Sequence, residues 1–466
     1  MGSEHFDFVV IGGGSAGYAA ARTAREAVNR VAIIDGSKDL GGLCILRGCM
    51  PSKTLIYSAE MLHQAQRGTL FGLNIPNAAA DMSAIHARKL RMIDDFASYR
   101  QSQLQSDRFT LFRDFASFVD EETVELRTSG LRITADHFLI ATGSDVNSPT
   151  IPGLADVPSW TSDDILELET RPESIIVLGG GIVATELGQF LQRIGTKVTL
   201  IQRSPAILKE ASANAAHVVM QALRDEGMTL FTDTHITRIS KSPGGVTVEF
   251  TVQGAPRRAE AAHLFNALGR RPSTRGLGLD AAGVELAQSG QIVVDAFQRT
   301  HNPRIYAAGD ATGPYEIVHL AVMQGEVAAK HACGLPTQPV DYTTRTSVVF
   351  TDPQIAEAGL PLLEAQQQDF DLIEAEYPFD DHGRSILMEA RYGYVRAWAD
   401  KKTGQLIGAE CVGKDAGELI HAMAVAVQLK AKVADLVKVH WYHPTLAEIW
   451  SYPLEDLLEQ ITESAS

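Results

Sequence analysis

The chain of 466 residues lacks several features that would place it in other classes of protein. It has only four cysteines, so it is not a small scaffold held together by disulfides. No apolar run reaches the ~18 residues of a membrane helix, and the acidic start of the chain lacks the basic segment and cleavage site of a signal peptide. We expect a soluble, cytoplasmic protein in a reducing compartment, with no membrane partner.

The chain also lacks a run of Lys and Arg long enough to form a nucleic-acid patch, and its formal net charge is −16. A nucleic-acid partner is therefore not expected. Apolar residues make up 45% of the chain, which is ample for large cores, and the length suggests about three domains.

Two of the four cysteines, Cys44 and Cys49, lie five positions apart and are followed by Pro-Ser-Lys. Proline favours the first turn of a helix, so a helix should begin near residues 50–51, which places Cys49 at its N-terminus. The positive end of the helix stabilises a thiolate there, which predicts a redox dithiol. A zinc site is not expected, because zinc needs about four ligands and the other two cysteines, Cys333 and Cys411, are far from this pair in the sequence. A pair of inert cysteines is the other alternative.

A glycine-rich fingerprint follows the first expected strand, at residues 6–11. It reads G-x-G-x-x-G over residues 12–17, opens a helix of small residues, and precedes a second strand at 31–34 that ends in Asp35. This setting predicts a dinucleotide site, with the pyrophosphate on the helix N-terminus and the acid on a ribose. The alternative is a glycine-rich turn in an ordinary α/β domain. The residues expected to contact the dinucleotide are Gly12, Gly14, Ser15, Gly17 and Asp35.

The same pattern returns after a proline-rich linker at residues 147–158. A strand at 174–178 leads into a second glycine loop, and a strand at 197–201 ends 23 positions after the first glycine of the loop, as in the first copy. Here Ala184 replaces the third glycine, and neutral Gln202 followed by Arg203 replaces the acid. The protein should therefore bind two different dinucleotides, and the second should carry a 2′-phosphate, which favours NADP(H) over NAD(H). The residues expected to contact it are Gly179, Gly181, Ile182, Gln202 and Arg203.

Three further segments carry a family resemblance along nearly the whole chain. They are residues 305–310 (IYAAGD), 349–353 (VFTDP) and 443–448 (HPTLAE). With the dithiol and the two fingerprints, they make the chain resemble the FAD-dependent pyridine nucleotide–disulfide oxidoreductases. This group includes dihydrolipoamide dehydrogenase, glutathione reductase and mercuric reductase.

The resemblance implies an α/β fold with two Rossmann-like dinucleotide-binding domains, for FAD and NAD(P), and a C-terminal α+β dimerisation domain. Residues 1–146 would form the first part of the FAD domain, 147–271 the NAD(P) domain, 272–342 the second part of the FAD domain with the central domain, and 343–466 the dimerisation domain. Strands at 137–143 and 264–272 would mark the crossings between domains. Further cofactor contacts are implied at Gly42, Lys53, Ala116, Ala141, Thr142, Gly143, Gly269, Arg270, Gly309, Asp310 and Ala321.

The resemblance also implies catalytic roles. Cys49 would lie next to the flavin and Cys44 would exchange with a small disulfide or dithiol substrate. His443, oriented by Glu448, would carry the proton, since an imidazole titrates near neutral pH. In the family this histidine serves the dithiol of the other subunit, which implies a homodimer with shared active sites. The alternative for His443 is an ordinary surface residue.

An ion pair between Lys53 and Glu186 would lie beside the reactive edge of the flavin; its alternative is a structural salt bridge. In the remainder of the C-terminal domain we expect a hairpin at residues 400–404 and one amphipathic helix over 417–436. We expect Cys333 and Cys411 to be inert.

The resemblance is strongest to dihydrolipoamide dehydrogenase, which acts on a lipoyl group, free or on a lipoyl domain. The residues that favour it are Tyr18, Ile182, His319 and Leu446. An NADPH-dependent, glutathione reductase-like enzyme is the first alternative, and the residues that favour it are Arg22, Ala184 and Arg203. Mercuric reductases lack His443 and carry a C-terminal cysteine pair that is missing here. A flavin-binding subunit without turnover is the second alternative.

Two residues beside the dithiol depart from the family pattern. Leu43 stands where a threonine is usual, and Arg47 adds a cation between the cysteines. We expect Arg47 to favour a thiolate or an anionic substrate.

Overall fold

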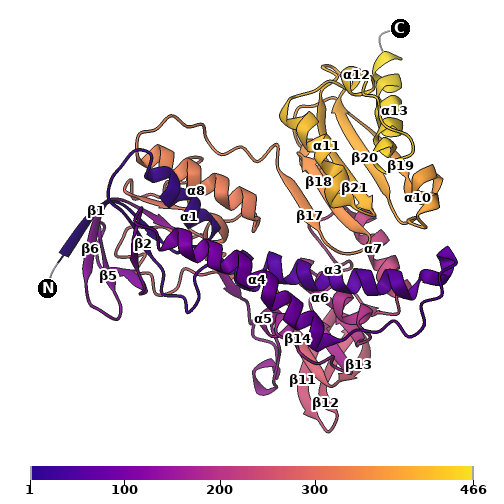
Figure 1. Cartoon of the computed structure of the whole chain (residues 1–466), viewed down its shortest axis with the longest axis horizontal. Coiled ribbons are helices and arrows are strands. Elements are labelled where there is room, and N and C mark those ends of the chain that lie inside the picture. The colour runs from indigo at the N-terminus through magenta and orange to yellow at the C-terminus, as the bar shows by residue number, and fades with distance from the viewer. Residues whose placement is uncertain (1–2, 464–466) are drawn as a thin grey trace.

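The computed structural model describes residues 3–463, and its first sheet has seven strands. Strands β1 and β2 carry the expected segments 6–11 and 31–34, and these segments are mostly apolar because both faces of the sheet are covered. Helices α1 and α8 cover one face (Figure 1). In order across the sheet the strands are β3 (Thr110–Phe112), β2 (Val31–Ile34), β1 (Ser3–Ile11), β6 (Arg132–Ile140), β5 (Thr123–Leu126) and β4 (Ala116–Phe118), with β16 (Ile305–Ala307) also on β6, and the helices are α1 (Ser15–Ala24) and α8 (Val318–Ala332).

The second copy of the pattern builds a four-stranded parallel sheet. The expected strands 174–178 and 197–201 match β8 and β9, and a three-stranded antiparallel sheet packs over one face of them. The elements are β8 (Ser174–Leu178), α6 (Ile182–Arg193), β9 (Lys197–Ile201), α7 (Ala213–Asp225), β10 (Thr229–Phe231), β11 (Thr234–Ser242), β12 (Gly245–Val252), β13 (Ala255–Ala261) and β14 (His263–Asn266).

The two crossings between these domains pair with each other as short antiparallel strands, β7 (Ser144–Val146) and β15 (Arg270–Pro272). The domain boundary expected after residue 271 therefore falls inside a strand. The other domain boundaries stay predictions.

The C-terminal part, called the interface domain below, contains a five-stranded antiparallel sheet with α11 and α13 on one face. Its hairpin between β20 and β21 is confirmed, but the single helix expected over 417–436 is wrong. The chain breaks there because Lys430 takes a left-handed backbone, φ 52°. The elements are β17 (Thr346–Val349), β18 (Gln354–Gly359), β19 (Leu372–Pro378), β20 (Tyr394–Asp400), β21 (Leu406–Gly413), α11 (Ala416–Gln428), α12 (Val433–Leu436) and α13 (Ser451–Thr462).

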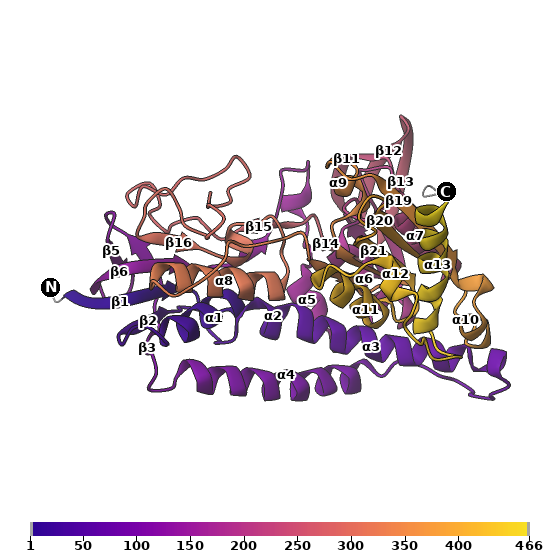
Figure 2. The same ribbon diagram turned by 90° about the horizontal axis from the view of Figure 1, so that it is seen from above.

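Two long helices, α3 (Cys49–Gln66) and α4 (Met82–Leu104), run side by side along the molecule and join its parts (Figures 1 and 2). The helix expected near residues 50–51 begins at Cys49. A short helix that the sequence did not predict, α2 (Gly42–Arg47), precedes it and carries Cys44. The remaining short helices are η1 (Gly68–Phe71), η2 (Leu154–Asp156), α5 (Ser162–Leu166), η3 (Gly309–Ala311), α9 (Leu362–Ala365), η4 (Phe379–Asp381), α10 (Gly383–Leu387) and η5 (Ala447–Trp450).

A buried ion network fixes the interface domain against the second nucleotide domain. Arg193 on α6 is almost fully buried and binds Glu226 at 2.6 Å and Asp352 at 2.8 Å. Asp352 belongs to the interface domain, so one guanidinium joins the two. Within residues 3–463, no helix combines the length and apolar character needed to cross a bilayer, and no three His, Cys, Asp or Glu side chains gather as a metal site.

Candidate active site

The first glycine loop closes against the end of strand β6. Gly12 has φ 105°, and a Cβ there would lie 2.3 Å from the Ala141 carbonyl oxygen, so only glycine fits. A Cβ on Gly17 would lie 1.9 Å from the Gly12 oxygen, which explains the third glycine of the motif. Asp35 is buried and accepts hydrogen bonds from the backbone N–H groups of Gly13 and Ser37, each at 2.9 Å.

The residues around this loop fit the FAD that the resemblance implies. Thr142 Oγ1 is buried and has no partner in the described part of the chain. Asp310 accepts a hydrogen bond from the Ser144 hydroxyl at 2.6 Å. Arg270 Nε donates to the oxygen of that Ser144 hydroxyl at 2.7 Å. An orphaned hydroxyl beside a helix N-terminus suits a phosphate or a polar flavin edge.

Most of the remaining expected FAD contacts lie around this loop, and the exception is Ala116. Gly42 touches Gly14, and Gly143 and Gly309 take left-handed backbones. Ala321 is buried on α8. Ala116 lies in β4 with its side chain in the core, so only its backbone is available. All of these FAD contacts stay predictions.

The second glycine loop repeats the geometry of the first. Gly179 also has φ 105°, and its Cβ would lie 2.4 Å from the Ala267 carbonyl oxygen. A Cβ on Gly181 would meet nothing within 4 Å, and Ile182 is exposed at the start of α6, so a flat ligand has room there. Gly269 follows β14 with φ 96°.

The residues that replace the acid in this loop differ in their surroundings. The Gln202 amide donates weakly to the Ala206 oxygen at 3.4 Å. Arg203 is exposed, and its side chain makes no hydrogen bond or ion pair with any residue between 3 and 463. Its guanidinium is therefore available for a ligand.

The two thiols are strongly polarised. Cys44 lies on α2, and Cys49 is the first residue of α3. A hydrogen bond from the Cys44 thiol, helped by the Lys53 ammonium, lowers the pKa of Cys49 to about 6 against the effect of burial. The same hydrogen bond and burial raise the pKa of Cys44. At neutral pH the reduced pair holds one thiolate, on Cys49, and one thiol, on Cys44.

The expected pair of Lys53 and Glu186 is present, with 2.6 Å between Nζ and Oε2. Glu186 is buried, and its other oxygen accepts from the Phe350 backbone N–H at 2.8 Å. The Lys53 ammonium also lies 4.7 Å from the centre of the Phe350 ring. The pair therefore holds a cation beside Cys49 and ties α3 to the interface domain.

We expected Arg47 to favour the thiolate, but the cation that does so is Lys53. The Arg47 guanidinium binds Asp163 on α5 at 3.0 Å, so it joins α2 to the second nucleotide domain. The cation that lowers the Cys49 pKa is Lys53. Cys333 and Cys411 behave as expected, because burial raises the pKa of both thiols, that of Cys333 to about 11.

His443 and Glu448 form the expected dyad. The Nδ1 atom of His443 lies 3.0 Å from each carboxylate oxygen of Glu448, which is buried. The imidazole is 80% exposed, so its Nε2 faces outward. Helix α13, which follows this segment, lies at the outer edge of the interface domain (Figure 1) and away from α2 (Figure 2). Among the described residues, no hydrogen bond or ion pair joins His443 to Cys44 or Cys49 of the same chain.

Two residues outside the sequence motifs, Arg100 and His382, lie near the dithiol and near Glu448, respectively. Arg100 on α4 stacks over the Tyr18 ring at 4.1 Å, and α4 packs on α2. Its Nε and Nη1 atoms are buried without a hydrogen-bond partner in the described chain. His382 lies behind Glu448, with Nε2 3.4 Å from Oε1. No sequence signal could have found either one, because only the tertiary packing brings them to the site.

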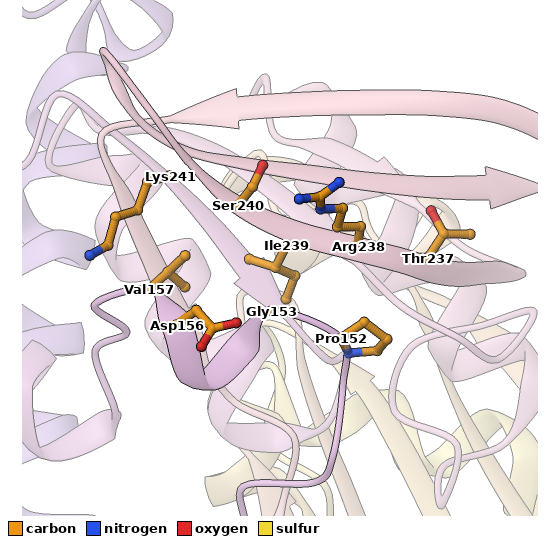
Figure 3. A pocket seen from close by; sticks show the side chains of 9 residues that line it. All are labelled: Pro152, Gly153, Asp156, Val157, Thr237, Arg238, Ile239, Ser240 and Lys241. Carbon is orange, nitrogen blue, oxygen red and sulfur yellow. The ribbon is translucent and has the colours of Figure 1, made fainter.

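The groove in Figure 3 lies elsewhere. It encloses about 400 Å³ between the linker around Gly153 and strand β11, and its lining includes Asp156, Arg238 and Lys241. None of the expected site residues lines it, so this groove is separate from the expected active site.

Comparison with known proteins agrees with this geometry. A family model described as pyridine nucleotide-disulphide oxidoreductase matches residues 6–325, and the model for the dimerisation domain of the same family matches residues 346–452. A mercuric reductase from Bacillus cereus is 35% identical over 96% of this chain and 70% of its own length. A dihydrolipoyl dehydrogenase from Chlamydia pneumoniae is 32% identical over 96% of both chains.

Solved structures give the same picture. LpdA from Mycobacterium tuberculosis has a TM-score of 0.86 at 29% identity, covering 97% of this chain and 99% of its own. The Cu(II) complex of RclA, an HOCl-induced flavoprotein disulfide reductase from Escherichia coli, has a TM-score of 0.84 at 25% identity with the same coverage. The names of these relatives refer to different substrates, so the comparisons do not identify the substrate of this chain.

Proposed function

The chain belongs to the pyridine nucleotide-disulphide oxidoreductase family, and we propose that it passes electrons between NADP(H), FAD, the Cys44–Cys49 pair and a small disulfide or dithiol. When bound, FAD supplies the flavin that exchanges electrons between the nucleotide and the cysteines. The observation that carries this proposal is the placement of the two cysteines, with Cys44 on α2, Cys49 at the start of α3 and the Lys53–Glu186 ion pair one turn further along α3.

The protonation states suggest the order of thiol exchange. A base must take the proton of Cys44, whose raised pKa keeps it a thiol. The Cys44 thiolate then attacks the substrate disulfide, forms a mixed disulfide and releases one thiolate, which takes up the proton. Cys49 next attacks the Cys44 sulfur, so the second substrate thiol leaves and the Cys44–Cys49 disulfide forms. The substrate gains two electrons from the dithiol and one proton from Cys44, and the second leaving thiolate takes its proton from solvent.

His443 of the partner subunit would be that base in a homodimer. Its side chain is 80% exposed, and no hydrogen bond or ion pair among the described residues joins it to the dithiol of its own chain. The matched dimerisation domain supports two-fold assembly. Glu448 would hold the imidazole by its Nδ1 atom and stabilise the cation that forms.

The first candidate substrate is dihydrolipoamide, by the likeness to dihydrolipoyl dehydrogenases. An anionic disulfide is the second, because Arg100 on α4 places a cation near Cys44, on the helix against which α4 packs. A steady-state screen of lipoamide, oxidised glutathione and Hg(II), each with NADH and NADPH, tests the function. Reduction of the flavin by nucleotide without turnover of any acceptor would instead support a flavin-binding subunit.

The Arg100 site makes a prediction about substrate charge. The Arg100→Gln variant should lower kcat/KM for the dianionic disulfide dithiobis(nitrobenzoate) by roughly 10- to 100-fold, since hydrogen bonds to charged groups contribute about 1.5–3 kcal/mol. Neutral dithiodipyridine, a similar aromatic disulfide, should react as before. Arg22→Gln is the control, because Arg22 is already paired with Glu326 at 2.7 Å. Equal losses for both probes, or loss of FAD, would contradict a role in substrate binding.

The second glycine loop makes a prediction about the nucleotide. We expect NADPH to be preferred over NADH, because Gln202 cannot repel a 2′-phosphate and the free Arg203 guanidinium can bind its oxygens. One such contact contributes about 1.5–3 kcal/mol, or roughly 10- to 100-fold in kcat/KM. The double variant Gln202→Glu with Arg203→Ala should lose that preference. Lys209→Ala should change it less, since Lys209 already pairs with Glu210 at 3.3 Å. A wild-type preference for NADH would overturn this interpretation.

A further inference from the structure

A second histidine stands behind the His443–Glu448 dyad. His382 is fully buried, directly before α10, and its Nε2 atom lies 3.4 Å from Glu448 Oε1. Its Nδ1 atom lies 2.8 Å from Ser385 Oγ. The Glu448 carboxylate is thus placed between two imidazoles, one exposed and one buried.

The surroundings favour one form of His382. Burial lowers its pKa, so the imidazole is neutral at neutral pH even though Glu448 opposes this. If the Ser385 hydroxyl donates to Nδ1, the ring proton remains on Nε2, the nitrogen that faces Glu448. That nitrogen has no other partner in the described chain. The 3.4 Å contact is not formed as a hydrogen bond, and a small rotation of either side chain would complete it.

We propose that His382 is a positioning residue, which donates from Nε2 to Glu448 and holds the carboxylate against Nδ1 of His443. The proposal rests on the proposed function, in which His443 carries the proton of thiol exchange. A buried carboxylate needs donors. Among the described residues, the side chains in reach of the Glu448 carboxylate are His443 and His382.

The other titratable groups near His382 are paired with each other. The Tyr377 hydroxyl donates to Asp381 at 3.0 Å, and its ring stacks on Tyr452 at 3.9 Å. Burial and the Asp381 carboxylate raise the pKa of Tyr377 to about 12, with smaller effects of Tyr452 and Asp456. Of the ionisable side chains around His382, the one in reach of its Nε2 atom is therefore Glu448.

The test compares three variants by two readouts. His382→Leu removes the donor, so the buried Glu448 should take up a proton more easily and His443 should lose its counter-charge. The His443 pKa should then fall by about one unit, and disulfide turnover at neutral pH should fall about tenfold, as for other groups that orient a working histidine. His382→Asn keeps an N–H donor and should retain both values. His86→Leu is the control, because His86 is also buried against a glutamate, Glu167 at 3.1 Å, but on α4.

The His443 pKa can be followed without turnover, by NMR titration of its ¹³C-labelled imidazole, assigned by the loss of the signal in His443→Ala. An unchanged His443 titration in folded His382→Leu would overturn the proposal. So would equal shifts in the Asn and Leu variants. If instead His443→Ala retains full turnover, the proposed function of the dyad fails, while the titration still decides whether His382 acts on Glu448 and His443.

Discussion

Replacing His443 with alanine is expected to slow disulfide turnover by roughly 10²–10⁴-fold, the range for loss of a positioned acid–base group. The effect should be large because the Cys44 thiol has a raised pKa and cannot attack a disulfide until a base removes its proton. FAD content and flavin reduction by nucleotide should be unchanged, since the side chain is 80% exposed and packs into no core. Stopped-flow measurement of the two half-reactions separates these outcomes.

The control for this variant is His440→Ala. His440 is also an exposed histidine, three positions earlier in the chain, and no hydrogen bond ties it to Glu448. Comparable losses in both variants would show that the segment, and not the imidazole of His443, matters.

The shared site gives the same prediction a second test. Mixing His443→Ala subunits with Cys44→Ser subunits should restore activity in heterodimers, where one intact base faces one intact dithiol. Mixtures as inactive as the two parents, with subunit exchange verified, would mean that each chain uses its own histidine.

Substitution of the cysteines is expected to have the second large effect, because either change removes the disulfide cycle altogether. Two-electron reduction of the wild type should give a long-wavelength charge-transfer band between the Cys49 thiolate and the flavin. Cys49→Ser should abolish the band, whereas Cys44→Ser should show it without reduction. Both variants should lose turnover of disulfides. Absorbance spectra under anaerobic conditions measure the band.

The pH dependence of the band follows from the Cys49 pKa of about 6. The thiolate is present above that pKa and is protonated as the pH falls through it, so the band of the reduced wild type should halve near pH 6 and disappear below. Cys333→Ser is the control and should leave the titration unchanged, since burial keeps that thiol protonated. A Cys44→Ser protein without the band between pH 7 and 9 would refute or reverse the two roles.

The amino-acid sequence by itself determined the parts of this protein that depend on local geometry. The two glycine loops are predictable because Gly12 and Gly179 each have a φ of 105°, and a Cβ added at either would lie closer than 2.5 Å to a carbonyl oxygen, which leaves no other residue type. The strands at 31–34, 174–178 and 197–201 are predictable because both faces of a parallel sheet are buried, so most of their positions are apolar. The same holds for the start of α3 at the dithiol, where proline marks a first turn.

Only the tertiary structure decided which charges act on the site. The cation between the cysteines in sequence, Arg47, turns to Asp163 on another domain, while Lys53 on the next helical turn serves Cys49. Electrostatic effects depend on distance and burial in space, and neither can be obtained from spacing along the chain. For the same reason the sequence could not identify Arg100 or His382, which belong to no motif. Arg100 is near Cys44 only because α4 packs on α2, and His382 is near Glu448 only because of the packing of the interface domain.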